Sequence, residues 1–126
     1  MELIIGGAYQ GKRAYAEALY REMQWIDGSS CSLEDALCAK GMDHFELFIK
    51  RILKEEGSGV HIADVLIEKN PEIVLISTEL GYGVVPVDKF DRIYREEVGR
   101  ICTKLAAFST KVHRVVCGVG MVIKGA

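Results

Sequence analysis

The chain has 126 residues, of which 49% are hydrophobic and 27% are charged, with a formal net charge of −2. This balance is typical of one globular domain and excludes an intrinsically disordered chain. Its 16 basic residues are offset by 18 acidic ones, so we expect no nucleic-acid partner. No apolar run approaches the roughly 20 residues that span a bilayer. The scattered cysteines lack a Cys-x-x-Cys pair and indicate a reduced, cytoplasmic protein rather than a zinc site.

The N-terminal half is predicted to alternate short strands and helices. Its elements are a strand over residues 1–5, a helix over 12–23, a short strand over 24–27 and a short helix from Ser32 to about Gly41. On the first of these helices we expect Tyr15, Leu19 and Met23 to face inward. Asp43, with Glu46 three residues later, resembles a capping box that opens another helix. That helix carries an apolar stripe of Phe45, Phe48, Ile49, Ile52 and Leu53.

The C-terminal half continues the alternation. The predicted elements are a helix over 60–69, a strand over 72–77, a loop over 78–87, a long helix over 88–108, a strand over 112–117 and an edge strand over 121–123. The long helix should turn Phe90, Tyr94, Ile101, Leu105 and Phe108 inward. Because residues 73–76 are continuously apolar, that strand should be buried on both faces. The order of elements predicts a three-layer α/β fold with a mainly parallel sheet, a single P-loop NTPase-like domain over residues 1–126.

A glycine-rich loop leaves the first strand and opens the first helix. Gly6, Gly11 and Lys12 fit the pattern Gly-x4-Gly-Lys, which binds phosphate through backbone N–H groups, the helix N-terminus and the lysine charge. This predicts binding of a nucleoside triphosphate, either GTP or ATP. The predicted nucleotide-binding residues are Gly6, Gly7, Ala8, Tyr9, Gln10, Gly11, Lys12 and Arg13.

The residue after the lysine departs from that pattern. A Ser or Thr hydroxyl normally follows and binds Mg²⁺, whereas this chain has Arg13. Two interpretations stay open. The metal is held by phosphate oxygens, water and a carboxylate, or Arg13 lies on the phosphates itself.

Two acidic residues at strand ends are candidates for catalysis together with Lys12. Asp27 follows the second predicted strand and is a candidate ligand for Mg²⁺, with an ordinary turn aspartate as the alternative. Glu79 follows the third and is a candidate base for a substrate hydroxyl or a metal ligand. His61 and His113 have no evident partner and are assigned structural roles.

Several segments resemble the adenosylcobinamide kinase/adenosylcobinamide-phosphate guanylyltransferase family. The most specific is residues 79–86, Glu-Leu-Gly-Tyr-Gly-Val-Val-Pro. The others are the loop with Ile4, Ile5, Ala16, Glu17 and Ala18, then Arg95, Gly99, residues 105–107, residues 115–120 and Lys124. Together they cover about half of the chain. The resemblance implies phosphorylation of the adenosylcobinamide hydroxyl, with a corrinoid substrate, and transfer of GMP through a guanylylated histidine.

The chain departs from the family in its shortened middle. Aligning residues 25–27 with the family's Walker-B-like strand removes the segment that carries the guanylyl acceptor, and His44 is then the candidate acceptor. The expectation is a kinase-like enzyme of cobalamin biosynthesis, and the alternative is a degenerate module that binds a nucleotide or a corrinoid without turnover. Unpaired sheet edges could be covered by a second copy of the chain.

Overall fold

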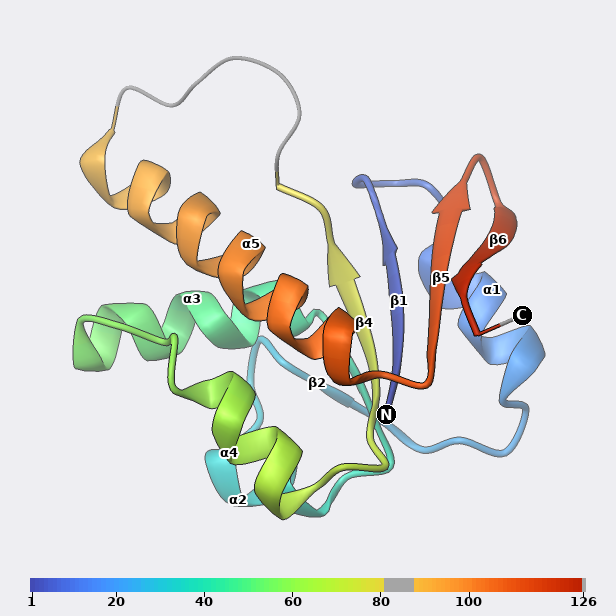
Figure 1. Cartoon of the computed structure of the whole chain (residues 1–126), viewed down its shortest axis with the longest axis horizontal. Helices are drawn as coiled ribbons and strands as arrows, with labels where there is room; N and C mark the ends of the chain where they lie inside the picture. Colours follow the sequence, from blue (N-terminus) through green and yellow to red (C-terminus); the bar gives the residue numbers. More distant parts are fainter. Residues whose placement is uncertain (81–87, 126) are drawn as a thin grey trace.

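The computed structural model describes residues 1–80 and 88–125, so most of the predicted loop over 78–87 lies outside the described residues. Its centre is a six-stranded sheet in the order β2-β3-β4-β1-β5-β6 (Figure 1). All pairs are parallel except β5 with β6. The strands are β1 (Glu2–Gly6), β2 (Trp25–Asp27), β3 (Gly41–Asp43), β4 (Val74–Thr78), β5 (Lys111–Val116) and β6 (Val119–Lys124).

Helices cover both faces of the sheet. They are α1 (Lys12–Leu19), α2 (Leu33–Cys38), α3 (Phe45–Glu56), α4 (Ile62–Lys69) and α5 (Lys89–Phe108). Figure 1 shows α1 on one side of the sheet and α3, α4 and α5 on the other. This arrangement confirms the predicted three-layer α/β fold with a mainly parallel sheet. No helix of the described ranges is long and apolar enough to cross a membrane.

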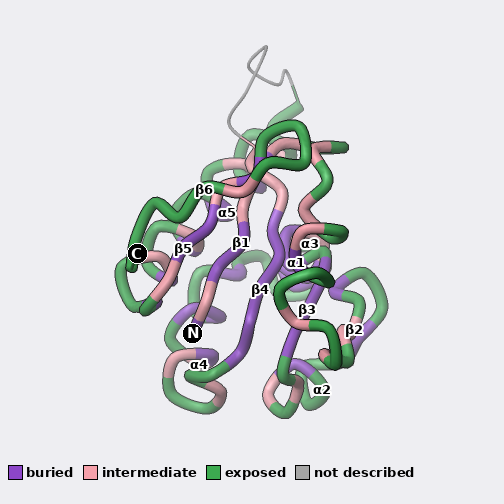
Figure 2. The backbone as a smooth tube through the Cα atoms, turned by 90° about the vertical axis from the view of Figure 1, so that its right-hand side faces the viewer, coloured by how far each residue is buried: buried purple, intermediate pink, exposed green. Residues whose placement is uncertain are grey.

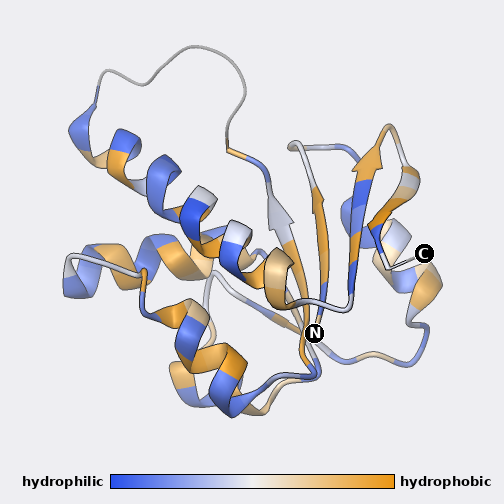
Figure 3. Ribbon diagram, in the orientation of Figure 1, coloured by the Kyte–Doolittle hydropathy of each residue, from blue (hydrophilic) through white to orange (hydrophobic). Residues whose placement is uncertain are grey.

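Two apolar clusters lie on opposite faces of the central strands. The larger contains Leu3 and Leu75 together with the inner faces of α3, α4 and α5, whereas the smaller joins Ile4 and Ile76 to Ala16 of α1. Alternate residues of β1 and β4 therefore serve both clusters, as strands buried on two faces require. Figure 2 shows β4 buried along most of its length. In Figure 3 the apolar faces of the helices turn toward the sheet.

The buried strand and the α3 stripe are confirmed. Residues 73–76 are all buried, and so are the five predicted stripe residues of α3. Two helix faces were predicted wrongly at their ends, because Leu19 is 47% exposed and Phe108 is 41% exposed. Helix α1 ends at Leu19 rather than Met23. Ala16 is its buried inward residue, and the predicted Tyr15 and Met23 pack, partly buried, against the same cluster.

The capping role predicted for Asp43 is wrong. Residues 41–43 form β3, which pairs with both β2 and β4, and His44 occupies the N-cap of α3 without a side-chain cap. The Glu46 side chain accepts instead from the backbone N–H of Thr78 at 3.4 Å. A three-residue strand carries too few side chains for a recognisable period. Its last residue, Asp43, together with Glu46, was therefore assigned to a helix cap.

We predict that Ile49→Ala lowers the free energy of unfolding by about 2–5 kcal/mol, because it leaves a cavity in the larger cluster. Ile49 is fully buried, whereas Ile123 on β6 is 56% exposed. Ile123→Ala is therefore the matched control and should cost much less. Urea unfolding of both variants checks this, and equal losses would contradict the assignment of Ile49 to the core.

Candidate nucleotide site

The glycine-rich loop runs from the end of β1 to the start of α1, as its sequence predicts. Gly11 is the N-cap of α1, with φ of 84°, a left-handed conformation that costs glycine little. A Cβ on Gly6 would lie 2.5 Å from the carbonyl oxygen of Val115. Only glycine therefore fits where the loop leaves the sheet beside β5.

Gln10 fastens the loop to the turn between β5 and β6. Its carbonyl oxygen accepts from the N–H of Gly118 at 2.7 Å, and its side-chain Oε1 accepts from the N–H of Cys117 at 2.7 Å. Cys117 and Gly118 both have positive φ, as a two-residue type I′ hairpin turn requires. This contact could not be predicted from the sequence, because it joins residues about a hundred positions apart.

A pocket of about 290 Å³ opens along the loop, close to the lower end of the sizes typical of small-molecule sites. Its lining residues come from the loop, the start of α1 and the ends of β3 and β4. They are Ala8, Tyr9, Gln10, Gly11, Lys12, Arg13, Ala14, Asp43, His44 and Thr78. Of the predicted nucleotide-binding residues, those from Ala8 to Arg13 line the pocket, and Gly6 and Gly7 do not. The predicted catalytic acid Asp27 contacts the lining residue His44, and Glu79 follows the lining residue Thr78 in the chain.

Lys12 is folded back onto the loop. Its Nζ donates to the carbonyl oxygen of Gly7 at 2.8 Å. Burial lowers the pKa of Lys12, and the nearby carboxylates of Glu46, Asp43 and Glu79 act in the opposite direction. The ammonium group is therefore surrounded by acidic side chains, and a phosphate would have to compete with them and with the Gly7 carbonyl.

Arg13 points along the sheet edge toward β3. Its Nη1 donates to Oδ2 of Asp43 at 2.9 Å, and its Nε donates to Oε1 of Glu17 at 2.6 Å. The guanidinium carbon also lies 5.6 Å from the centre of the Trp25 ring. Three contacts thus hold the guanidinium, and one of them is with Asp43, the carboxylate predicted from the sequence to cap a helix.

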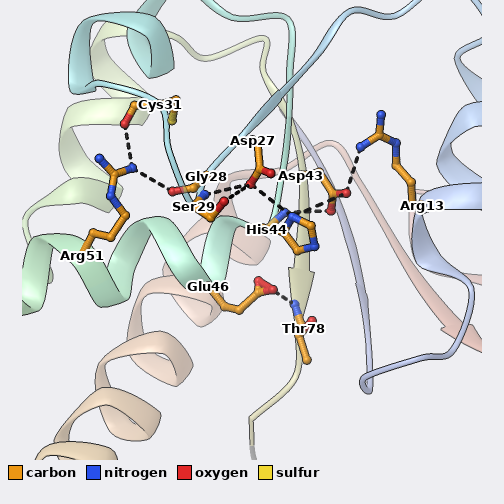
Figure 4. A network of polar contacts seen from close by, with 10 residues as sticks. All are labelled: Arg13, Asp27, Gly28, Ser29, Cys31, Asp43, His44, Glu46, Arg51 and Thr78. Atoms are coloured by element: carbon orange, nitrogen blue, oxygen red, sulfur yellow. Dashed lines mark hydrogen bonds and ion pairs between the residues drawn. The ribbon is translucent and has the colours of Figure 1, made fainter.

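Asp43 is the acidic residue among those that line the pocket. It ends β3 and is only 6% exposed. Its Oδ1 accepts from the N–H of His44 at 2.7 Å, and Figure 4 shows its carboxylate between His44 and Arg13. A buried carboxylate is stable only when paired and hydrogen-bonded, and these two contacts meet that requirement.

His44 joins the pocket to Asp27. Its backbone has φ of 54°, a conformation uncommon for residues other than glycine and often found at functional sites. Its Nδ1 lies 3.2 Å from Oδ1 of Asp27. The same oxygen accepts from the backbone N–H of Ser29 at 2.9 Å and from the Ser29 hydroxyl at 2.7 Å (Figure 4). The backbone bond from Ser29 is the main cause that lowers the pKa of Asp27.

Glu79 is tied to the loop through its backbone. Its N–H donates to the carbonyl oxygen of Gly6 at 2.8 Å, which continues the pairing of β4 with β1 by one residue. Its carboxylate lies 3.3 Å from Nε of Arg114 on β5. The end of β4 thus places this acid next to the glycine-rich loop, as its position in the sequence suggested.

These side chains fit a divalent cation poorly. In P-loop proteins the ion lies between the hydroxyl after the lysine and an aspartate at a strand end. Here Arg13 replaces the hydroxyl and already pairs with Asp43. Within residues 1–80 and 88–125, no group of three or more His, Cys, Asp or Glu side chains is arranged to hold a metal. Asp27, the predicted Mg²⁺ ligand, points to Ser29 and His44.

The chain is similar to a known protein family over most of its length. A family model described as cobinamide kinase / cobinamide phosphate guanyltransferase matches residues 26–123. Two bifunctional adenosylcobalamin biosynthesis proteins, from Salmonella typhimurium and Escherichia coli, are each 40% identical over 53 residues. Those residues are 42% of this chain and only 29% of the length of each relative.

We predict that Ser29→Ala raises the pKa of Asp27 toward its ordinary value, because one of the hydrogen bonds that stabilise the carboxylate is lost. A folded-state pKa below the unfolded value adds stability above the unfolded pKa, and this stability disappears as pH falls through the folded pKa. The variant should therefore lose less stability on acidification than the wild type.

The measurement is an NMR titration of the Asp27 carboxyl carbon. Ser30→Ala is the control, since the Ser30 backbone N–H bonds the carbonyl oxygen of Asp27 and its side chain is not among the groups that lower the pKa of Asp27. An unchanged Asp27 titration in Ser29→Ala would refute the role given to that hydroxyl.

Proposed function

Because the chain belongs to the cobinamide kinase / cobinamide phosphate guanyltransferase family, we propose that it binds GTP or ATP at residues 6–13 and transfers a phosphoryl group to the hydroxyl of adenosylcobinamide. The observation that carries this proposal is the pocket in which the loop, Lys12 and the ends of β3 and β4 meet. We place the reaction in cobalamin biosynthesis and the protein in the cytoplasm as parts of the same proposal.

Lys12 is the proposed phosphate-binding cation. On binding, its Nζ would leave the carbonyl oxygen of Gly7 for a phosphate oxygen, which accepts a stronger, charge-assisted hydrogen bond. The loop N–H groups and the N-terminus of α1 supply further donors. Phosphoryl transfer depends mainly on such positioning and charge stabilisation.

Glu79 is the proposed base for the acceptor hydroxyl. Its backbone bond to Gly6 fixes it at the loop, and its side chain is 18% exposed, so it can reach a substrate that enters from the pocket side. Asp27 has the supporting role of orienting His44, whose Nδ1 lies 3.2 Å from Oδ1 of Asp27. For the family's second activity, His44 is the candidate guanylyl acceptor.

A second candidate function is a binding module that holds a nucleotide or a corrinoid without turnover. The ion pair of Arg13 with Asp43 favours it, because that pair occupies both side chains that would hold the metal in a catalytic P-loop site. Binding and turnover therefore need separate tests.

We predict that Lys12→Ala weakens binding of GTP and ATP by about 10- to 150-fold, since a hydrogen bond to a charged group contributes about 1.5–3 kcal/mol. Isothermal titration calorimetry measures this directly. Lys104→Ala is the matched control, because Lys104 pairs with Asp64 on the surface, away from the loop. Equal affinity in wild type and Lys12→Ala would refute nucleotide binding at this loop.

We predict that Glu79→Gln lowers the rate of adenosylcobinamide phosphorylation by about 100-fold or more, the usual contribution of a general base, while nucleotide affinity changes little. Glu72→Gln, at an exposed turn before β4, is the control. The assay follows phosphorylated corrinoid by chromatography. Wild-type protein that binds nucleotide but forms no such product would support the binding module instead of the kinase.

A further inference from the structure

The side chain after the P-loop lysine stands where a metal ion would be held. We propose that the Arg13 guanidinium replaces the divalent cation, so that this site binds its nucleotide without Mg²⁺. The inference rests on the proposed nucleotide site and specifies how that site neutralises charge.

Both protein ligands that a metal would use are already engaged with each other. Arg13 occupies the position of the metal-binding hydroxyl. Asp43 is the strand-end aspartate that lines the same pocket. Nη1 of Arg13 lies 2.9 Å from Oδ2 of Asp43. The other carboxylate oxygen of Asp43 accepts from the N–H of His44 at 2.7 Å. An ion entering here would have to displace a guanidinium of the same sign of charge.

The guanidinium is held from more than one direction, so its position does not depend on Asp43 alone. Glu17, one turn along α1, accepts from Nε at 2.6 Å, and the Trp25 ring lies 5.6 Å from the guanidinium carbon. Arg13 also lines the pocket and is 46% exposed. Since arginine presents five donors in a planar fork, donors remain for a phosphate oxygen.

The other acidic side chains around the loop also have hydrogen-bond or ion-pair partners. Glu79 pairs with Arg114, and Glu46 accepts from the Thr78 N–H. Asp27 is bonded to Ser29 and His44. Each of these carboxylates already accepts from a donor, and within residues 1–80 and 88–125 no three acidic, histidine or cysteine side chains are grouped to hold a metal, although Mg²⁺ prefers several oxygen ligands.

The test compares nucleotide affinity in excess Mg²⁺ and in excess EDTA, by calorimetric titration of wild-type protein with GTP and with ATP. We expect wild-type dissociation constants to agree within about threefold in the two buffers. In Arg13→Ser, which restores the hydroxyl and frees Asp43, Mg²⁺ should tighten binding by about tenfold or more. Thermal unfolding shows whether each variant is folded.

Arg13→Gln serves if the serine variant does not fold, because it keeps a polar, helix-favouring side chain and removes the charge. It should likewise bind more tightly with Mg²⁺ than with EDTA. Arg100→Ser is the matched control, since Arg100 is an exposed helical arginine paired with Glu96 four residues earlier, as Arg13 is paired with Glu17 four residues later. The control should keep the wild-type indifference to Mg²⁺.

The possible failures are separable. If wild type binds nucleotide only when Mg²⁺ is present, the inference about Arg13 is wrong and the proposed nucleotide site stands. If both Arg13 variants bind equally well in Mg²⁺ and EDTA, Arg13 is not the reason for metal independence and the inference is also wrong. If wild type binds no nucleotide in either buffer, the proposed function fails and the inference falls with it.

Discussion

The parallel pairing of β1 with β4 and β5 is the constraint on which the candidate site depends. Parallel strands bring their carboxyl ends to one edge, where ligands bind in open α/β sheets. Gly6 is in register with Thr78, so the loop that follows β1 lies beside the acid that follows β4. Pairing of β3 with β4 adds Asp43 to the same edge. Three chain segments that are distant in sequence thereby reach one pocket without any long insertion.

The charges at this edge form a balanced set. Lys12 lies near the carboxylates of Asp43, Glu46 and Glu79, while Arg13 and Arg114 each pair with one of those acids. A buried carboxylate without a partner is strongly destabilising, so Asp43 requires a cation whether or not nucleotide is present. An arginine supplied by the chain itself meets that requirement permanently, whereas a metal would meet it only when bound. Arg13 thus stabilises this edge of the sheet independently of any ligand.

The sequence predicted those features that depend on local hydrophobic patterns. The run over residues 73–76 and the stripe on α3 are long enough to show their period, and the loop at Gly6 to Lys12 has a specific spacing. The sequence did not reveal β3, because Met42 is its one large apolar residue and its burial comes from neighbouring strands. For the same reason Asp43 resembled a helix cap, and Asp27 was preferred as the acid near the loop. The contact of Arg13 with Asp43 and those of Gln10 with the β5–β6 turn depend on tertiary packing, which no spacing in the sequence encodes.

The bonds from Gln10 to Cys117 and Gly118 have a consequence for the order of folding. Contacts between residues so far apart in the chain form after local ones, because the intervening segment must first be closed into a loop. During synthesis the N-terminal residues emerge first, yet the glycine-rich loop lacks two of its anchors until the β5–β6 hairpin has left the ribosome. The loop thus acquires its final shape late, when the chain is nearly complete.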